Sequence, residues 1–448
     1  MENRKFYASQ CGVELNSDVY NGGGGDDTEP LQALLDKALS LGRVYLVLDG
    51  AARISKPLRI HANTTIECPD KSCGLFLSDN SDSCIIRNAN QTDKPDGIKD
   101  RNITLLGGVY NHNSPGQIHH REEGPGLHIL SNFVMAMEFC GVEHFLMRDV
   151  TIANQRVYAA LILNFKHVTM ENIHIDRRVR DDHQNQDGLH FFGPGRFLAL
   201  RNIRGNSGDD FIALAPDELD LKSEIEDVLI DGVHFDDADQ GIRLLCREQG
   251  RLDRVVIKNV TGTYRSYGFI MTPWFDSKTG GNYGNIIFDT VDVRPMKNNY
   301  DYAPPFLFKI CGRIEHLTLN NIYCHRPGYG HTFMIAGGDY DLVGLERPER
   351  PTEINRLDIK NLYIDEDNQD GVQDAYIRIK SRVGSISISD TDFRRSANLS
   401  GGTFIRVEDG ATVGDLRLLN VVLPSSLDKL MDSKPRAIHH FKADNVES

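Results

Sequence analysis

The stretch that decides the fold is KHVTMENIHI, residues 166–175. Apolar and polar side chains alternate up to Asn172 and then resume their alternation, as expected of a β-strand with a bend. The same pattern recurs downstream as RFLALRNIRG (196–205), EDVLIDGVHF (226–235) and DRVVIKNVTG (253–262). A repeat of this kind predicts one structural unit that is stacked many times.

The bend residues recur about once every 30 positions. They are Asp149, Asn172, Asn202, Asp231, Asn259, Thr290 and Asn321, separated by 23, 30, 29, 28, 31 and 31 residues. Such a gap holds two or three short strands and shows no crossover helix, so successive turns of a coil would stack about 4.8 Å apart. Asn suits the bend because it tolerates left-handed backbone and its amide can bond to the neighbouring coils. We predict an all-β chain that forms a single right-handed parallel β-helix; a propeller needs about 40 residues per blade and fits less well.

The first 50 residues differ from the repeats. Four glycines (22–25) precede DTEP (27–30), where Asp27 is expected to cap a helix whose first turn contains Pro30. One face of this helix would carry Leu31, Leu34, Leu35, Ala38 and Leu39. We expect residues 1–50 to form an N-terminal segment whose short helix caps the open end of the coil, and residues 51–448 to form one continuous β-helix domain. No Lys-Ser or Lys-Thr follows the glycines, which argues against a phosphate-binding loop.

Composition narrows the range of partners. The chain has 448 residues, of which 40% are apolar and 25% charged, and its formal net charge is -14. Scattered basic residues on an acidic protein argue against nucleic acid or an anionic membrane surface as partner. No run approaches the roughly 18 apolar residues that would span a bilayer. The N-terminus, Met1 to Lys5, lacks the apolar core of a signal peptide, so we expect a cytoplasmic protein.

Eight cysteines are spread along the chain without a CxxC pair. They are Cys11, Cys68, Cys73, Cys84, Cys140, Cys246, Cys311 and Cys324. Most of them lie inside apolar strand-like runs. We interpret them as small buried side chains in a reducing compartment, in preference to disulfides or a zinc site.

Two segments carry more acidic residues than the repeat pattern requires. They are NQDGLH (185–190) and GDDFIAL (208–214), and Asp209 follows Asp187 by 22 residues, about one coil. We expect Asp187 and Asp209 one above the other with Asp210 alongside, and their repulsion should raise the pKa of at least one carboxyl. An acid that protonates the departing oxygen and a carboxylate that activates water are the requirements of glycoside hydrolysis. A purely structural ladder of Asp residues and a calcium site are the alternatives.

These segments resemble the signature of glycoside hydrolase family 28, the polygalacturonases and their relatives. The shared pattern is Asn-x-Asp-Gly followed one coil later by Gly-Asp-Asp-x-Ile-Ala, and NQRVY (154–158) with KHVTMENI (166–173) is similar to the strand before the acids. The resemblance covers roughly residues 20 to 400 and implies a pectin-lyase-like solenoid. It also implies an inverting hydrolase in which Asp209 is the general acid and Asp187 and Asp210 position and deprotonate water.

The chain departs from the family on the following coils. The family's Gly-His-Gly is matched by DQGIR (239–243), and its Arg-Ile-Lys by YGFIM (267–271), so Gln240 replaces the histidine and the basic pair is absent. A literal Arg-Ile-Lys occurs at 378–380, several coils further on, where we expect a surface strand. Arg243 is the basic residue best placed to compensate, because its guanidinium offers a fork of hydrogen-bond donors.

The sequence therefore predicts a glycosidase that acts on a poly- or oligosaccharide. Candidate substrate-binding residues are Tyr158, Asn185, His190, Gln240, Arg243 and Trp274, with His183 as a further neighbour of Asp187. We expect no cofactor and no metal. A polysaccharide lyase or uronate epimerase on the same scaffold, or a β-helix that binds carbohydrate without catalysis, remain the alternative functions.

Overall fold

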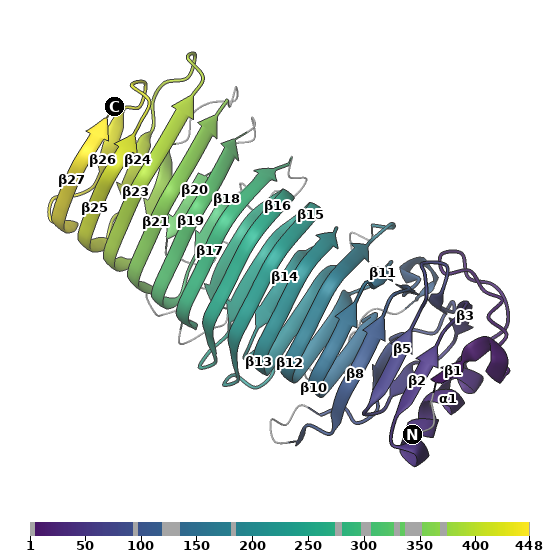
Figure 1. Cartoon of the computed structure of the whole chain (residues 1–448). Coiled ribbons are helices and arrows are strands. Elements are labelled where there is room, and N and C mark those ends of the chain that lie inside the picture. Colours follow the sequence, from purple (N-terminus) through teal and green to yellow (C-terminus); the bar gives the residue numbers. More distant parts are fainter. Residues whose placement is uncertain are drawn as a thin grey trace. The chain divides into compact units, whose positions relative to one another are not determined.

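The computed structural model describes residues 5–92, 97–118, 135–180, 185–273, 280–296, 306–326, 332–336, 352–367 and 374–447. The chain forms a right-handed parallel β-helix (Figure 1), which confirms the predicted fold class. It divides into two compact units, Met1–Ala213 and Leu214–Ser448. That residues 51–448 form one continuous domain stays a prediction.

The first unit is built from short strands that later merge into long, bent ones. It begins with β1 (Lys5–Tyr7), η1 (Ala8–Cys11) and α1 (Thr28–Leu41). Its further elements are β2 (Val44–Val47), β3 (Ala51–Ile54), β4 (Leu58–Ile60), β5 (Thr64–Glu67), β6 (Gly74–Leu77), β7 (Ile86–Asn88), β8 (Asp100–Leu106), β9 (Val109–Asn111), η3 (Ser114–Gly116), β10 (Met137–Arg148), β11 (Thr151–Ala153), β12 (Tyr158–Asp176) and β13 (Asp187–Gly205).

Three faces of this unit follow from the strand pairing. All pairs are parallel: β2, β5 and β8 continue into β10, β3, β6 and β9 continue into β11, and β4 and β7 continue into β10. The long strands β12 and β13 bend and contribute to all three faces. We call the face formed by β4, β7 and the first halves of β10, β12 and β13 the site face, because Tyr158 and Asp187 lie on it.

Strand β14 (Asp210–Ala215) crosses the boundary between the units. The second unit contains β15 (Glu224–Cys246), β16 (Arg251–Pro273), β17 (Asn282–Pro295), β18 (Phe306–Ile310), β19 (Arg313–Arg326), β20 (Thr332–Ala336), β21 (Glu353–Glu366), β22 (Ala375–Ile379), β23 (Arg382–Arg395), β24 (Thr403–Val407), β25 (Thr412–Val422), β26 (Lys429–Asp432) and β27 (Ile438–Glu447). Here β16, β18, β20, β22, β24 and β26 pair in succession, and so do β17, β19, β21, β23, β25 and β27. Aromatic rings stack along the core, as between Phe269 and Phe308, whose centroids are 4.9 Å apart.

The predicted role of the bend residues is confirmed. Asn172 (φ 55°) and Asn202 (φ 51°) have left-handed backbone. The amide of Asn172 donates to Asp149 at 2.7 Å, and that of Asn202 donates to Asn172 at 2.7 Å. One bend was misplaced: at this bend of β15 the left-handed residue is Gly232 (φ 78°) and not Asp231, because glycine adopts this backbone without steric cost. Asp231 still accepts a bond from the Asn259 amide at 2.7 Å.

Helix α1 covers the beginning of the coil (Figure 1), as predicted. The amide of Gln32 donates to the Arg59 carbonyl at 3.1 Å and accepts from the Arg59 N–H at 2.8 Å, so it pairs with backbone groups of β4. Two details of the prediction were wrong. Asp27 occupies the predicted N-cap position, but its side chain makes no capping hydrogen bond, since its carboxylate accepts from the N–H groups of Glu14 and Leu15 instead. Leu39 is 72% exposed, whereas the other apolar residues of its predicted face are buried.

Seven of the eight cysteines are buried, as predicted, and only Cys11 is exposed; all eight are free thiols. Burial raises the pKa of the Cys68 thiol to about 12, which keeps this side chain protonated and inert. Within the described ranges, none of the helices has the length and apolar character needed to cross a bilayer.

Candidate functional site

Asp187 lies at the start of β13 on the site face and contacts two residues that were predicted with it. Its carboxylate oxygen Oδ2 is 2.9 Å from His190 Nδ1, and the two side chains are only 3% and 5% exposed. The His190 ring stacks on Tyr158, with centroids 4.4 Å apart and planes inclined by 26°. Tyr158 is the register partner of Asp187 on β12, one coil earlier. The structure thus brings Asp187, His190 and Tyr158 into one buried cluster.

The second acidic segment lies directly beside the first. The N–H of Gly208 donates to the Gln186 carbonyl at 2.9 Å, so the residues just before Asp209 and Asp187 are joined by a backbone hydrogen bond. Asp210, the first residue of β14, is buried, and Asp209 is partly exposed. The two acidic segments are therefore neighbours, as the spacing of 22 residues predicted.

Two glycines of the acidic motifs permit this close approach. A Cβ on Gly188 would lie 2.2 Å from the Phe211 carbonyl oxygen, well inside the contact distance of real side chains. A Cβ on Gly208 would lie 2.9 Å from the Asn185 carbonyl oxygen and from Gln186 Cβ. Each acidic segment thus needs its glycine for the other to pack against it.

A pair of glutamines holds the first acidic segment in place. The Gln155 amide donates to the carbonyls of Gln186 and Asp187, both at 3.3 Å, and the Gln186 amide donates back to the Gln155 carbonyl at 3.2 Å. Both side chains are completely buried. Because each amide bonds to the backbone of the neighbouring coil, the turn before Asp187 is fixed relative to β12.

The remaining predicted residues are each described by their own surroundings. Asn185 is exposed to solvent. Gln240 is buried on β15 in register with Tyr267, and half-buried Arg243 is in register with Ile270, both in the second unit. Trp274 and His183 lie outside the described residues. The substrate-binding roles of all these residues stay predictions, as does the raised pKa of one acid.

Arg177 was missed by the sequence analysis. This buried arginine follows β12, and its Nη1 would be 3.3 Å from a Cβ placed on Gly208. A guanidinium this close to the Asp209 segment is a source of positive charge for the site. Its sequence signal was weak, because Arg177 and Arg178 look like a solvated pair at the end of a strand.

Glu138 was also missed, since a single acid within MEFCGV looked like part of an ordinary strand. It lies on β10 in the register row that runs from Arg87 through Glu138 and Leu161 to His190. Burial raises the pKa of its carboxyl to about 7, while the Gln91 side chain and the charge of Arg87 act in the opposite direction. The site face thus holds an acid that exchanges its proton near neutrality.

His112 connects the segment before Tyr158 with Ser83 through its two ring nitrogens. Its Nδ1 accepts from the Arg156 N–H at 3.1 Å, so Nε2 carries the proton that it donates to the Ser83 carbonyl at 3.0 Å. Burial lowers the pKa of this imidazole to about 4. His112 is therefore a neutral structural group and not a proton donor at ordinary pH.

The described part of the chain contains no group of three or more His, Cys, Asp or Glu side chains arranged to share a metal ion. The chemistry that the site offers is that of carboxyl groups, an imidazole and a buried guanidinium.

Comparison with known proteins identifies the fold. No protein-family profile matches the chain, and no curated protein sequence matches it. Among solved structures, the family 28 exopolygalacturonase of Yersinia enterocolitica is 14% identical and has a TM-score of 0.52, with 100% of this chain and 78% of that chain covered. The tailspike protein of E. coli bacteriophage HK620, in complex with a hexasaccharide, is 10% identical with a TM-score of 0.63 and coverages of 99% and 80%.

DFA-IIIase from Arthrobacter chlorophenolicus A6 is similar to the same degree. It is 11% identical, the coverage is 99% of both chains, and the TM-score is 0.51. At such low identities the similarity concerns the backbone, and it includes the polygalacturonase that the acidic motifs suggested. The chain therefore shares the parallel β-helix fold of these proteins.

Proposed function

We propose that this protein is a carbohydrate-active enzyme that hydrolyses a glycosidic bond with the carboxyl groups of Asp187, Asp209 and Asp210. The observation that carries the proposal is the packing of two acidic segments on adjacent coils. A backbone hydrogen bond joins Gly208 to Gln186, and the glycines at 188 and 208 leave room for the two segments to approach each other. A structural ladder of Asp residues would need neither the buried His190 beside Asp187 nor the stacked Tyr158.

Inversion at the anomeric carbon would use the carboxyls in different roles. Asp209, the more exposed of the pair at 209 and 210, donates a proton to the departing oxygen. Asp187 and Asp210 position the attacking water and accept its proton. The proton that leaves Asp209 is replaced by the one taken from water, so the enzyme returns to its starting state through exchange with solvent.

His190 and Arg177 support these roles. The bond to Asp187 Oδ2 places a proton on His190 Nδ1 and orients the carboxylate, while the stacked Tyr158 fixes the imidazole plane. Arg177 lies against Gly208 and supplies a positive charge beside the Asp209 segment. Both are positioning residues in this scheme.

The substrate is a poly- or oligosaccharide. An exopolygalacturonase and a tailspike that holds a hexasaccharide share the fold, which supports a carbohydrate as ligand. A neutral sugar and a uronate are both compatible with the proposal, because Gln240 replaces the histidine that the family resemblance expects, and the segment 267–271 lacks the expected basic pair.

The test is turnover of a panel of oligosaccharides by the parent protein and by Asp209→Asn and Asp187→Asn. Each substitution should lower kcat by at least about 100-fold, the usual size of an acid or base contribution. Asp149→Asn is the matched control: it exchanges the same side chain in the same unit, at a bend where asparagine recurs on other coils, and should keep full activity.

Three results would contradict the proposal. Near-normal rates in both variants would exclude the acids from the chemistry. Products that absorb in the ultraviolet through a new double bond would identify a lyase, and binding without turnover of any glycan would leave a carbohydrate-binding protein.

A further inference from the structure

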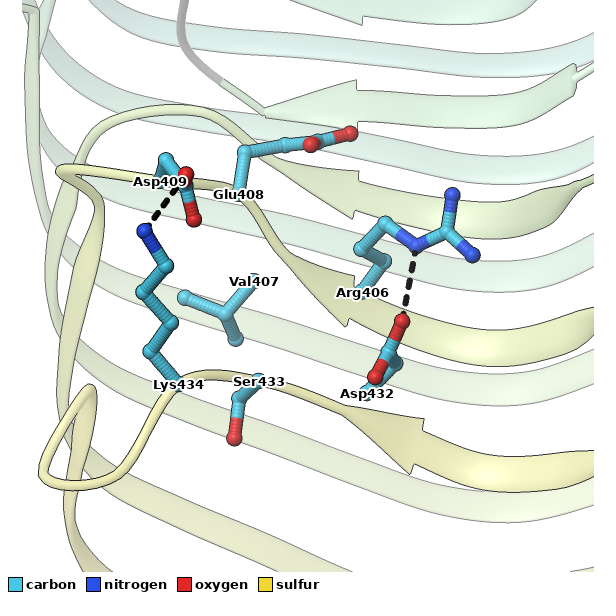
Figure 2. A pocket seen from close by; sticks show the side chains of 7 residues that line it. All are labelled: Arg406, Val407, Glu408, Asp409, Asp432, Ser433 and Lys434. Carbon is cyan, nitrogen blue, oxygen red and sulfur yellow. Dashed lines mark hydrogen bonds and ion pairs between the residues drawn. The ribbon is translucent and has the colours of Figure 1, made fainter.

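A polar pocket lies in the last coils of the second unit, between β24 and β26 and the turns that follow them (Figure 2). Its volume is about 380 Å³, within the roughly 300 to 1,000 Å³ of small-molecule sites. Its lining includes Arg406, Val407, Glu408, Asp409, Asp432 and Lys434.

Ion pairs hold the charged walls of this pocket. Arg406 Nε is 3.3 Å from Asp432 Oδ2, and Lys434 Nζ is 2.6 Å from Asp409 Oδ2. Figure 2 shows these two pairs with Val407 between them. Val407 is only 4% exposed, so the pocket has a small apolar floor between two pairs of opposite charge.

Neighbouring coils reinforce the arrangement. Arg378 donates from Nε and Nη2 to Glu408 Oε1 at 2.9 and 2.7 Å, and Arg406 is also paired with Asp374. Arg378, Arg406 and Asp432 are register partners on β22, β24 and β26. Polar groups therefore recur along the pocket at the coil spacing of about 4.8 Å, close to the length of one pyranose ring.

The charge pattern selects the kind of ligand. The lining contains two cationic and three carboxylate side chains, so an anion would meet excess negative charge and a cation would have to compete with Arg406 and Lys434. A hydroxyl group both donates to a carboxylate and accepts from a guanidinium or an ammonium. Side chains that already form an ion pair can still bond to a hydroxyl group, because a carboxylate has about four acceptor sites and a guanidinium has five donors.

We propose that the pocket between β24 and β26 is a binding subsite for a neutral, hydroxyl-rich sugar unit. Hydroxyls bond to Arg406, Glu408 and Asp432, and the C–H face of the ring packs on Val407. The exposed pair of Asp409 and Lys434 stands at the rim, where the two side chains bond to a further hydroxyl of the sugar. The proposal rests on the proposed function only in taking a carbohydrate as ligand, and it involves none of the acids Asp187, Asp209 and Asp210.

Methyl NMR of the full chain tests this with a local readout. The methyl groups of Val407 report on the pocket, and those of Leu189, next to Gly188, report on the acidic segments. Asp209→Asn protein is titrated with cellotetraose, maltotetraose and a neutral fructo-oligosaccharide, and with tetragalacturonate as an acidic probe. At least one neutral glycan should shift the Val407 signals with saturation, and tetragalacturonate should shift them less.

The matched variants are Asp409→Asn with Lys434→Ala, and Lys56→Ala. The double variant at Asp409 and Lys434 removes an exposed ion pair at the rim and should weaken the glycan affinity measured at Val407 at least tenfold. Lys56→Ala breaks a comparably exposed pair, with Glu29 in the first unit, and should leave the titration unchanged.

Absence of a Val407 response to every neutral glycan would overturn the subsite, as would a stronger response to tetragalacturonate or an unchanged titration in the rim variant. A response at Val407 without one at Leu189 would support the subsite while counting against the catalytic site. The opposite pattern would reject the subsite and leave the proposed reaction standing.

Discussion

At the residue scale, the site face holds a carboxyl group, that of Glu138, whose charge depends on burial. Asp187 is enclosed with His190, and Glu138 lies two rungs earlier in the row that ends at His190. Burial deprives a carboxylate of its hydration and so disfavours the charged form, which keeps the carboxyl protonated to higher pH, the state that a proton donor needs. Glu138 therefore has the proton affinity usually associated with an active site, although its sequence context is an ordinary strand.

Glu138 makes stability depend on pH in a defined window. Its carboxyl has a pKa of about 7 in the folded chain and 4.5 as the reference value, so between these limits the folded state binds a proton that the unfolded state has lost. Stability is then fully present below about pH 4.5 and falls as pH rises to about 7, by about 3 kcal/mol. Glu138→Gln removes this loss. The free energy of unfolding of the variant should equal that of the parent near pH 4 and exceed it by up to about 3 kcal/mol at pH 8.

Urea unfolding across pH 4 to 8 measures the difference. Glu29→Gln is the control, because the Glu29 side chain is 81% exposed and should leave the pH profile unchanged. If the free energies of unfolding of Glu138→Gln and the parent differed by the same amount at every pH, the raised pKa of Glu138 would be refuted.

At the scale of elements, the sequence predicted the strands and their bends better than the contacts between coils. Alternation and asparagine located the bend of β12, because only a few residue types tolerate left-handed backbone there. The bend of β15 was misplaced by one residue, since Asp231 precedes a glycine that takes the strained position at lower cost.

Side chains with two possible partners were harder to predict. Asp27 has the sequence position of a helix cap, yet backbone N–H groups of a distant loop occupy its carboxylate. Arg177 and Glu138 became visible only when coils were stacked, because their significance lies in neighbours 20 or more residues away. The two acidic segments could be predicted because their separation equals one coil.

Gly188 is the element-scale test of the site. Alanine would place Cβ against the Phe211 carbonyl and push β13 away from β14, which should cost about 1 to 3 kcal/mol and lower turnover more than 10-fold. Gly410→Ala is the control: its Cβ meets nothing within 4 Å, so only the backbone strain at φ 84° is added.

Thermal unfolding and kcat are measured for both variants. If both variants lose the same stability but only Gly188→Ala loses activity, the acidic coils need their close packing for turnover. Full activity of Gly188→Ala would show that the approach of β14 to Asp187 is not required.

At the scale of the whole molecule, each coil touches mainly the coils before and after it, so stability is expected to be local. A buried network in the second unit illustrates this. Arg395 Nε is 2.9 Å from Glu366 Oε2, both side chains are 0% exposed, and the Tyr376 hydroxyl bonds to both. This network of three side chains joins β21, β22 and β23, which all belong to the second unit.

Arg395→Met should therefore unfold part of the chain selectively. It leaves the Glu366 charge buried without its cation, at a cost of about 3 to 5 kcal/mol, and Arg395→Met with Glu366→Gln should recover part of this loss. Hydrogen exchange should accelerate in β21 to β25 and stay unchanged in β2 and β5. Uniform acceleration along the chain would show that the coils unfold as one cooperative unit.

The amide ladder at the bends has a direction. Asn172 donates to Asp149, Asn202 to Asn172, Asn420 to Asp390 and Asn445 to Asn420, so the later coil gives the hydrogen and the earlier one receives it. Aspartate can occupy the receiving position, whereas asparagine can both receive and give. A coil copied in tandem with its asparagine would thus satisfy both neighbours at once, and the protein could lengthen by gene duplication, one whole turn at a time, without stranding a polar group.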